Sequence, residues 1–429
     1  MLKKTKGKQM EIIKEGPKGV TEEGRKVATA RCVEYKEAIQ DYLDAKKNIP
    51  CGLDLTEKNK EQKQKILSVL NGSEKDWNDW KWQVKNMIRD VETLSKIFPL
   101  SEDEKKQIEE VGKEVRWGVS PYYASLIDPD DPNCPVRMQS IPSIQEALDP
   151  SIVTEPETIL YNSPAPCITR LYPDRLIINV TNACSMFCRH CLRRRDIGFE
   201  NIRYAKESIK DALSYIRENT EIRDVLLTGG DALMVSDEYL DWILSELDSI
   251  DHVEIKRLGT RTPVVLPMRI TDEFCEMLEK HGTIYLNTQF NHSKEITETS
   301  AEAIKKLTKA GVLVGNQTVL LKGINADKHI MKKLMQDALR IRVKPYYIFH
   351  CKKLEGIRHF RAHIEDGLEI MEYLRGYTSG LAIPTYIITA PSGRGKTPVN
   401  PNYILNTNVD GQVLFRTWGG HVMKYDNER

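Results

Sequence analysis

Short runs of β-branched and apolar residues recur through the second half of this 429-residue chain, and each is followed by a segment with helical periodicity. The runs are Leu176–Val180, Val225–Thr228, Val253–Leu258, Thr283–Asn287, Leu313–Val319 and Pro345–Phe349. After the first gap, their starting points lie 28, 30, 30 and 32 residues apart, close to the length of one βαβ unit. Six such units predict an α/β fold, a partial parallel (β/α)6 barrel, because the closed form needs eight. A doubly wound open sheet is the alternative that the pattern leaves open.

Polar residues stand at the ends of these predicted strands, where parallel α/β folds place their active sites. A cysteine-rich run follows the first strand, and Thr228–Asp231 follows the second. The other strands end in or contain Arg257–Arg261, Asn287–Gln289, Asn316–Gln317 and His350–Lys353. Six such coincidences predict an active-site mouth at this edge of the sheet.

Three cysteines in the first of these segments, Cys184, Cys188 and Cys191, have the spacing C-x3-C-x2-C. Thiolates are the usual ligands of iron–sulfur clusters, and three of them leave one iron of a [4Fe-4S] cubane free to bind another molecule. A structural zinc site needs a fourth ligand. The local candidate, His190, lies between two of the cysteines, a poor position for the same tetrahedron. The cluster is therefore favoured over zinc and over three unliganded thiols.

The chain divides by composition into four predicted regions. Residues 1–75 form a charged helical extension, and residues 76–165 form a helical region with tryptophans at near-helical spacing, which we expect to be core or interface residues. Residues 166–400 form the partial barrel, and residues 401–429 form a C-terminal tail.

Composition narrows the class of protein. The net charge of +1 gives no overall attraction to nucleic acid or to an acidic membrane surface. The lysine-rich start lacks the apolar core of a signal peptide, and no apolar stretch approaches the ~20 residues of a membrane span. The nine cysteines are scattered and odd in number, which favours reduced thiols. We expect a cytoplasmic protein that acts on a small molecule and binds neither nucleic acid nor membrane.

Several motifs together resemble a known family. The cysteine run resembles that of radical S-adenosylmethionine enzymes. With Leu171–Arg175, Arg261–Pro267, Leu286–His292 and Gly395–Pro398, the chain is similar to the lysine 2,3-aminomutase family. The resemblance implies three cofactors, a [4Fe-4S] cluster, S-adenosyl-L-methionine and pyridoxal 5′-phosphate. It also implies a one-electron reductant such as flavodoxin or ferredoxin. Separately, the long helical N-terminus favours a homo-oligomer.

The S-adenosylmethionine site is expected at the cysteine loop and the strand ends. Gly229 and Gly230 let backbone carbonyls approach the amino end of this ligand, and Asp231 adds charge. By resemblance, Gln317 contacts the same cofactor. An ordinary strand-end turn is the alternative for the glycines and Asp231, and a polar residue satisfied inside the barrel is the alternative for Gln317.

The segment Ala390–Pro398 formally fits a relaxed phosphate-loop pattern. Such a loop runs directly into a helix, which Pro398 and Pro401 forbid, so nucleotide hydrolysis is disfavoured. The family resemblance instead makes Lys396 the lysine that holds pyridoxal phosphate covalently, with Gly395 near its phosphate. A lysine in an ordinary loop is the alternative.

The resemblance places Tyr172 and Arg175 against the pyridoxal cofactor. The family commonly has an arginine directly before this tyrosine, whereas this chain has Leu171 there and Arg170 one place earlier. Whether Arg170 serves the phosphate is left open by the sequence.

The resemblance also assigns substrate contacts. Arg193 matches the arginine that grips the substrate α-carboxylate, a role suited to bidentate pairing. Lysine-specific members hold the distal ammonium with two aspartates, and the matching positions here are Lys352 and Thr389. A lysine substrate would bring two ammoniums together in a desolvated pocket. We therefore expect conversion of L-glutamate to β-glutamate by 1,2-amino migration. Action on lysine or another amino acid, with Lys352 facing outward, is the alternative.

Overall fold

A computed structural model describes residues 19–149, 161–391, 393–407 and 412–426. By internal contacts the chain forms two compact units, Met1–Asn48 and Ile49–Arg429. The first contains helices α1 (Glu22–Glu37) and α2 (Gln40–Ala45). Within the charged helical extension expected over residues 1–75, Ile39 separates α1 from α2, and no residue of α1 is buried.

The second unit begins with short helices. They are α3 (Thr56–Leu70), α4 (Glu74–Trp77), α5 (Trp80–Lys85), α6 (Val91–Ile97), α7 (Glu102–Glu114), α8 (Pro121–Ala124) and α9 (Pro135–Ser140). Serine capping boxes start two of them, since Ser73 pairs with Asp76 before α4 and Ser101 pairs with Glu104 before α7. Trp77 lies in the core, as expected.

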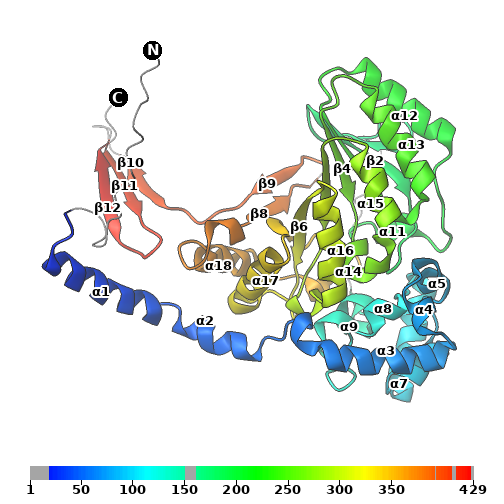
Figure 1. The fold of residues 1–429 in the computed structure, drawn as a ribbon, viewed down its shortest axis with the longest axis horizontal. Coiled ribbons are helices and arrows are strands. Elements are labelled where there is room, and N and C mark those ends of the chain that lie inside the picture. Colours follow the sequence, from blue (N-terminus) through cyan, green and yellow to red (C-terminus); the bar gives the residue numbers. More distant parts are fainter. Residues whose placement is uncertain (1–18, 150–160, 392, 408–411, 427–429) are drawn as a thin grey trace, which may run out of the picture. The chain divides into compact units, whose positions relative to one another are not determined.

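A nine-stranded sheet forms the centre of this unit, and its strands follow one another in chain order (Figure 1). They are β1 (Ile168–Thr169), β2 (Arg175–Thr181), β3 (Asp224–Gly229), β4 (Ile255–Gly259), β5 (Ile284–Thr288), β6 (Leu313–Leu320), β7 (Lys344–His350), β8 (Thr385–Thr389) and β9 (Lys396–Pro398). Strands β2 to β8 are parallel, whereas β1 and β9 pair antiparallel at the two edges. The predicted partial barrel is confirmed, and β8 adds a parallel strand to the six expected.

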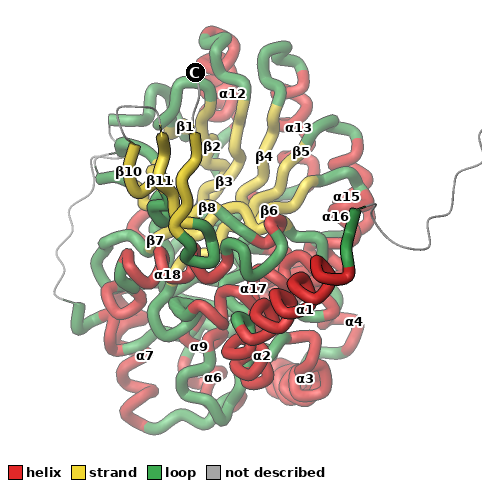
Figure 2. Tube along the Cα trace, turned by 90° about the vertical axis from the view of Figure 1, so that its left-hand side faces the viewer, coloured by secondary structure: helices red, strands yellow, loops and turns green. Residues whose placement is uncertain are grey.

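Amphipathic helices cover one face of the curved sheet, whose strands fan out side by side in Figure 2. They are α12 (Lys206–Glu218), α13 (Asp237–Asp248), α15 (Asp272–Glu279), α16 (Glu298–Lys309), α17 (Lys328–Arg340) and α18 (Ile364–Leu374), with short α11 (Arg194–Ile197) and α14 (Thr262–Val265) in connections. Residues of β2 alternate between buried and half-buried positions. The buried set, including Leu176 and Ile178, joins the helix side chains in one core, and the other set lines the open face.

The C-terminal residues form a separate three-stranded antiparallel sheet of β10 (Ile404–Thr407), β11 (Gln412–Arg416) and β12 (Val422–Asp426). Beyond β11, Trp418 packs edge-on against Tyr377. Its indole lies so close to Gly376 that a Cβ atom there would meet it at 2.4 Å.

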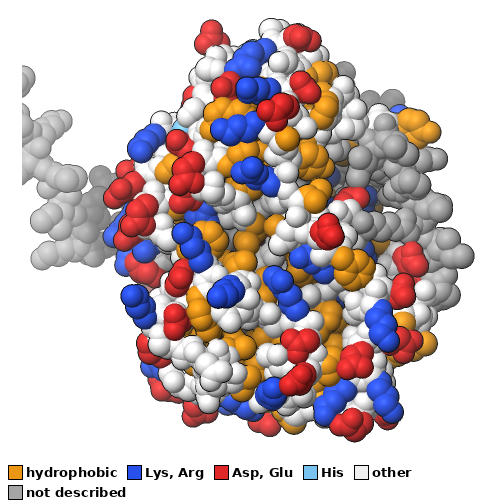
Figure 3. Space-filling model, turned by 90° about the vertical axis from the view of Figure 1, so that its right-hand side faces the viewer, with side chains coloured by type: hydrophobic (Ala, Val, Ile, Leu, Met, Phe, Trp, Pro, Cys, Tyr) orange, Lys and Arg blue, Asp and Glu red, His pale blue; other side chains and the backbone are white. Residues whose placement is uncertain are grey.

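The surface shown in Figure 3 carries acidic and basic side chains interspersed, in keeping with the small net charge. Among the residues that the structure describes, no helix is both long enough and apolar enough to cross a membrane.

Candidate active site

The three cysteines lie in the loop between β2 and α11, at the carboxyl end of the parallel sheet. Cys184 and Cys191 pack against an apolar cluster of Met87, Phe187 and Ile197. Burial, followed by the nearby Cys188, raises the pKa of the Cys191 thiol to about 11. Over the described ranges, no three His, Cys, Asp or Glu side chains are grouped to hold one metal ion.

Gly229, the last residue of β3, and Gly230, which follows it, lie directly against this loop. A Cβ atom on Gly229 would lie 2.1 Å from the carbonyl oxygen of Thr181, and one on Gly230 would lie 2.4 Å from that of Ala183. Gly229 also has φ +131°, a conformation that disfavours other residues. The glycines thus allow the end of β3 to approach the chain segment that leads into Cys184. That backbone carbonyls of this turn approach the amino end of S-adenosylmethionine stays a prediction.

Asp231 joins the ends of two strands. Its carboxylate accepts hydrogen bonds from Thr260 Oγ1 at 2.5 Å, from the backbone N–H of Arg261 at 2.8 Å and from that of Leu233 at 3.0 Å. Burial raises the pKa of Asp231, and these hydrogen bonds oppose the rise. The residue therefore fixes the loop after β4 beside the cysteine loop.

Two arginines of the cysteine segment share one buried carboxylate. Arg189 pairs with both oxygens of Glu146, at 2.9 and 2.6 Å, and Arg194 approaches one of them at 2.7 Å. Burial alone would raise the pKa of Glu146, but the two guanidinium groups lower it below its usual value. The pairing ties the cysteine loop to the turn Ile144–Glu146.

A third arginine reaches a cysteine sulfur. Arg261 Nη1 lies 2.9 Å from Cys188 Sγ, and its Nη2 lies 2.6 Å from the carboxylate of Glu295. By contrast, His190 Nε2 lies 3.3 Å from Asn291 Nδ2, and its ring packs edge-on against Phe360.

Lys396 opens the edge strand β9, and the residues expected around it are brought together. Its backbone N–H donates to Tyr172 Oη at 2.8 Å, and the Arg175 guanidinium lies 4.0 Å from the centre of the Tyr172 ring. Gly395, with φ +85°, packs against the same ring. Sequence positions 172, 175, 395 and 396 therefore form one site.

The Lys396 ammonium points over the aromatic rings of Tyr347 and Phe349, at 5.3 and 4.9 Å from their centres. Although the residue as a whole is exposed, its Nζ is desolvated there. Desolvation, together with the charges of Arg257 and Arg175, lowers the pKa of Lys396 to about 8. A lysine of this kind is a competent nucleophile near neutral pH.

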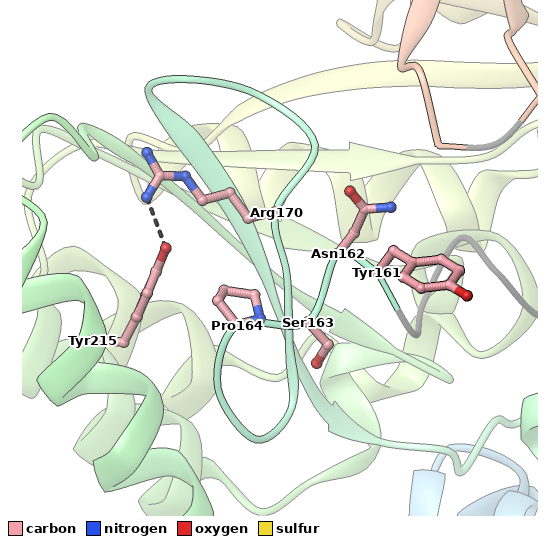
Figure 4. A pocket seen from close by; sticks show the side chains of 6 residues that line it. All are labelled: Tyr161, Asn162, Ser163, Pro164, Arg170 and Tyr215. Carbon is pink, nitrogen blue, oxygen red and sulfur yellow. Dashed lines mark hydrogen bonds between the residues drawn. The ribbon is translucent and has the colours of Figure 1, made fainter.

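Arg170 forms its own set of polar contacts. Its guanidinium donates to Tyr215 Oη at 2.9 Å (Figure 4), to Glu221 at 2.6 Å and to the carbonyl oxygen of Pro173 at 2.7 Å. It borders a surface pocket lined also by Tyr161, Asn162, Ser163, Pro164 and Tyr215. Arg170 therefore supports the turn that follows Tyr172.

The predicted substrate residues Thr389, Lys352 and Arg193 and the predicted S-adenosylmethionine residue Gln317 lie on or next to strands of the sheet. Thr389 is the direct partner of Lys396 in the β8–β9 pair, so the two side chains project to the same face. Lys352 follows the end of β7, and Gln317 lies in β6 opposite Tyr347 of β7. The Arg193 side chain hydrogen-bonds Asn179 of β2, which places it between the cysteine loop and the sheet.

Comparison with known proteins agrees with this geometry. A family model described as the radical SAM superfamily matches residues 178–334, and one described as lysine-2,3-aminomutase matches residues 371–429. Glutamate 2,3-aminomutase of Clostridioides difficile (strain 630) is 55% identical over 95% of this chain and 96% of its own. The L-lysine 2,3-aminomutases of Clostridium subterminale and Bacillus subtilis (strain 168) are 48% and 49% identical over 82% of this chain, and over 85% and 75% of their own. The chain belongs to the lysine 2,3-aminomutase family of radical S-adenosylmethionine enzymes.

A member of this family is an isomerase that uses a [4Fe-4S] cluster, S-adenosyl-L-methionine and pyridoxal 5′-phosphate. The donor chemistry of this aminomutase suits two of them. Three cysteine thiols stand on one loop, where they could ligate a cluster, and a desolvated lysine lies over Tyr347 near Tyr172 and Arg175. The family resemblance inferred from the motifs is confirmed.

Sequence reasoning missed the charged residues that hold the aminomutase site together. Glu146 had no visible role, although it neutralises two arginines of the cysteine segment. Arg261 was expected at the active-site mouth and within a family motif, but not as a partner of a cysteine sulfur. Its signal was present, because an arginine at a predicted strand end beside a cysteine loop is a candidate sulfur partner.

Proposed function

We propose that this protein is a glutamate 2,3-aminomutase, which moves the amino group of L-glutamate from C2 to C3 to give β-glutamate. One observation carries the choice of substrate. Thr389 stands where lysine-specific members have an acid by resemblance, and it is the direct strand partner of Lys396. The position that selects the distal group therefore lies beside the lysine that holds the cofactor, and it offers a hydroxyl donor, not a carboxylate.

The charges around Lys396 support an anionic substrate. Desolvation lowers the pKa of Lys396 most, and the charges of Arg257 and Arg175 lower it further, whereas Asp224 opposes them. A second ammonium from a lysine substrate would add to this repulsion, whereas a distal carboxylate would be attracted. The 55% identical relative is a glutamate 2,3-aminomutase, in agreement with this preference.

Each residue then has a proposed role. Cys184, Cys188 and Cys191 ligate the cluster, and Gln317 with the Gly229–Asp231 turn borders the S-adenosylmethionine. Lys396 holds pyridoxal phosphate, with Tyr172, Arg175 and Gly395 against it. When bound, the pyridoxal group supplies a carbonyl that takes up the migrating nitrogen and stabilises radical spin.

Substrate orientation is proposed to come from three side chains. Arg193 binds the α-carboxylate, and its guanidinium is fixed by the hydrogen bond to Asn179. Lys352 and Thr389 bind the distal carboxylate. Lys396 releases the cofactor to the substrate as a neutral amine and takes it back after migration. Its lowered pKa makes the neutral form accessible near pH 8.

We also propose the setting in which the enzyme works. A flavodoxin or ferredoxin supplies one electron per cluster reduction. The nine cysteines are all free thiols, which supports a reducing cytoplasmic compartment. Exposed apolar side chains on β10 and β12, among them Ile404, Val422 and Tyr425, support association into a homo-oligomer.

Product analysis tests the proposed reaction. Anaerobically reconstituted enzyme, with reductant, S-adenosylmethionine and pyridoxal phosphate, is incubated with single amino acids. We expect β-glutamate from L-glutamate and no β-lysine from L-lysine. The double variant K352D/T389D should lose glutamate turnover by orders of magnitude and gain lysine turnover. Preferential turnover of lysine by the wild-type enzyme would refute the proposal.

A further inference from the structure

The motif Arg261–Pro267 has no part in the proposed reaction, yet its first residue makes the most direct contact with a cluster ligand. Arg261 Nη1 donates a hydrogen bond to Cys188 Sγ at 2.9 Å. A guanidinium remains protonated in proteins, so this contact brings a full positive charge to the sulfur.

The Arg261 side chain is held in this position from several directions. Its Nε donates to the carbonyl oxygen of Gln289 at 3.0 Å, and its Nη2 donates to Gln139 Oε1 at 2.5 Å and to Glu295 at 2.6 Å. Its backbone N–H donates to Asp231. With 7% of its surface exposed, Arg261 cannot turn its charge toward solvent. The guanidinium is therefore preorganised toward the sulfur.

The counter-charge is equally fixed. Glu295 is fully buried, and its carboxylate accepts hydrogen bonds from Tyr123 Oη at 2.6 Å and from the backbone N–H groups of Asn291 and His292, at 2.5 and 2.8 Å. These donors, together with Arg261, satisfy the hydrogen-bonding capacity of the buried carboxylate. Glu295 thus balances the charge of Arg261 on the side of the guanidinium that faces away from Cys188.

We propose that Arg261 is a positioning residue that sets the reduction potential of the cluster through its charged hydrogen bond to the Cys188 thiolate. Reduction by an external one-electron donor adds one electron to the cluster, and no bond forms or breaks at Arg261. The added negative charge spreads onto the sulfurs, where a fixed cation and an N–H···S bond stabilise the reduced state. Arg261 thereby raises the potential and eases reduction. The inference concerns the cluster alone and goes beyond the choice of substrate.

The test is a redox titration of the cluster-loaded full-length protein, followed by electron paramagnetic resonance. In R261M, the ratio of reduced to oxidised cluster at a fixed potential should fall about tenfold. For a one-electron couple, this corresponds to a midpoint potential about 59 mV more negative. R261K keeps the positive charge but lacks the planar set of guanidinium N–H donors, so it should shift the ratio less. The matched control is R269K, because Arg269 is also a buried arginine but pairs with Asp237 and donates to the Leu233 and Val235 carbonyls. Its midpoint should equal that of the wild-type enzyme.

A second readout uses the wild-type protein and so does not depend on the folding of a variant. Arginine labelled with 15N only at its terminal guanidinium nitrogens should give a hyperfine-coupled nitrogen in the reduced cluster. This label excludes the backbone N–H of Arg193, which donates to Cys191 Sγ at 3.3 Å. An unchanged midpoint in fully loaded R261M, or no coupling from the label, would overturn the proposal. Neither readout needs an amino acid substrate, so the result is independent of the proposed reaction.

Discussion

The cysteine loop and the Lys396 segment serve one active site but are built in opposite ways. The cysteine loop is enclosed. Two glycines admit the neighbouring strand end, and Glu146, Arg189 and Arg261 fix it through buried ion pairs and a hydrogen bond to sulfur. The segment with Lys396 lies in an edge strand, and all three residues of β9 are exposed.

The difference follows from what each region must do. A cluster ligand has to keep one geometry through every turnover, and buried networks supply such rigidity. A lysine that releases and retakes its cofactor has to move, and segments with few buried contacts open at low cost. Beyond strand pairing, the Lys396 backbone is held by the hydrogen bond to Tyr172.

The largest expected effect separates the two regions by function. Replacement C188A removes one of three cluster thiolates, so we expect loss of bound iron and of S-adenosylmethionine cleavage to below detection. The absorbance of protein-bound pyridoxal phosphate should persist, because Tyr172, Gly395 and Lys396 are untouched. Iron analysis, assay of 5′-deoxyadenosine and absorbance spectra check this outcome.

The mirror-image variant K396A is its control. It should keep the iron content of the wild-type enzyme and lose the absorbance of covalently held pyridoxal phosphate. If C188A also lost that absorbance, the two regions would not be separate and the comparison would fail.

The next effect concerns stability. Replacement E146A leaves two buried guanidinium groups, of Arg189 and Arg194, without their carboxylate. Removal of one partner of a buried ion pair costs about 3–5 kcal/mol in the free energy of unfolding. Denaturant unfolding under anaerobic conditions measures the loss. E221A, which breaks the exposed pair with Arg170, should leave the unfolding midpoint in place; equal losses in the two variants would contradict the prediction.

Much of this architecture could be predicted from sequence, because strand and helix periodicity is local. The strands β2 to β7 fall on the six predicted runs. Strand β8 was not predicted, since it begins at Thr385 after a long connection and breaks the ~30-residue step. The cysteine spacing and Lys396 are also local motifs. Which partners neutralise the buried arginines could not be predicted, because Glu146 and Glu295 meet them only after distant loops pack together.

One substitution, glycine to alanine, should have unequal effects in the two regions. In G230A the new Cβ meets backbone at 2.4 Å, and forced overpacking of this kind costs about 1–3 kcal/mol or more and should reduce cluster loading. In G395A the Cβ meets the Tyr172 ring at 3.1 Å, and the φ of +85° adds about 1–2 kcal/mol of backbone strain. Because β9 is an exposed edge, part of that strain relaxes, and affinity for pyridoxal phosphate should fall while iron loading stays normal. Iron content and titration with pyridoxal phosphate, measured on both variants, test these expectations. Reduced iron in G395A would contradict the expected independence of the two regions.

The smallest expected effect is a shift in the pH dependence of covalent attachment of pyridoxal phosphate to Lys396. Lys396 must be neutral to add to the carbonyl of pyridoxal phosphate, so the rate of covalent attachment should rise with pH up to its pKa of about 8 and then level off. The charge of Arg257 lowers this pKa and that of Asp224 raises it. The midpoint should therefore move to higher pH in R257M and to lower pH in D224N, each by a fraction of a unit, since charges at a solvent-accessible mouth are screened. Absorbance-followed mixing of pyridoxal phosphate with the protein measures both midpoints. Shifts of the same sign would show that the variants act by distorting the site, because the two residues form an ion pair at 2.7 Å and removing either also breaks that pair.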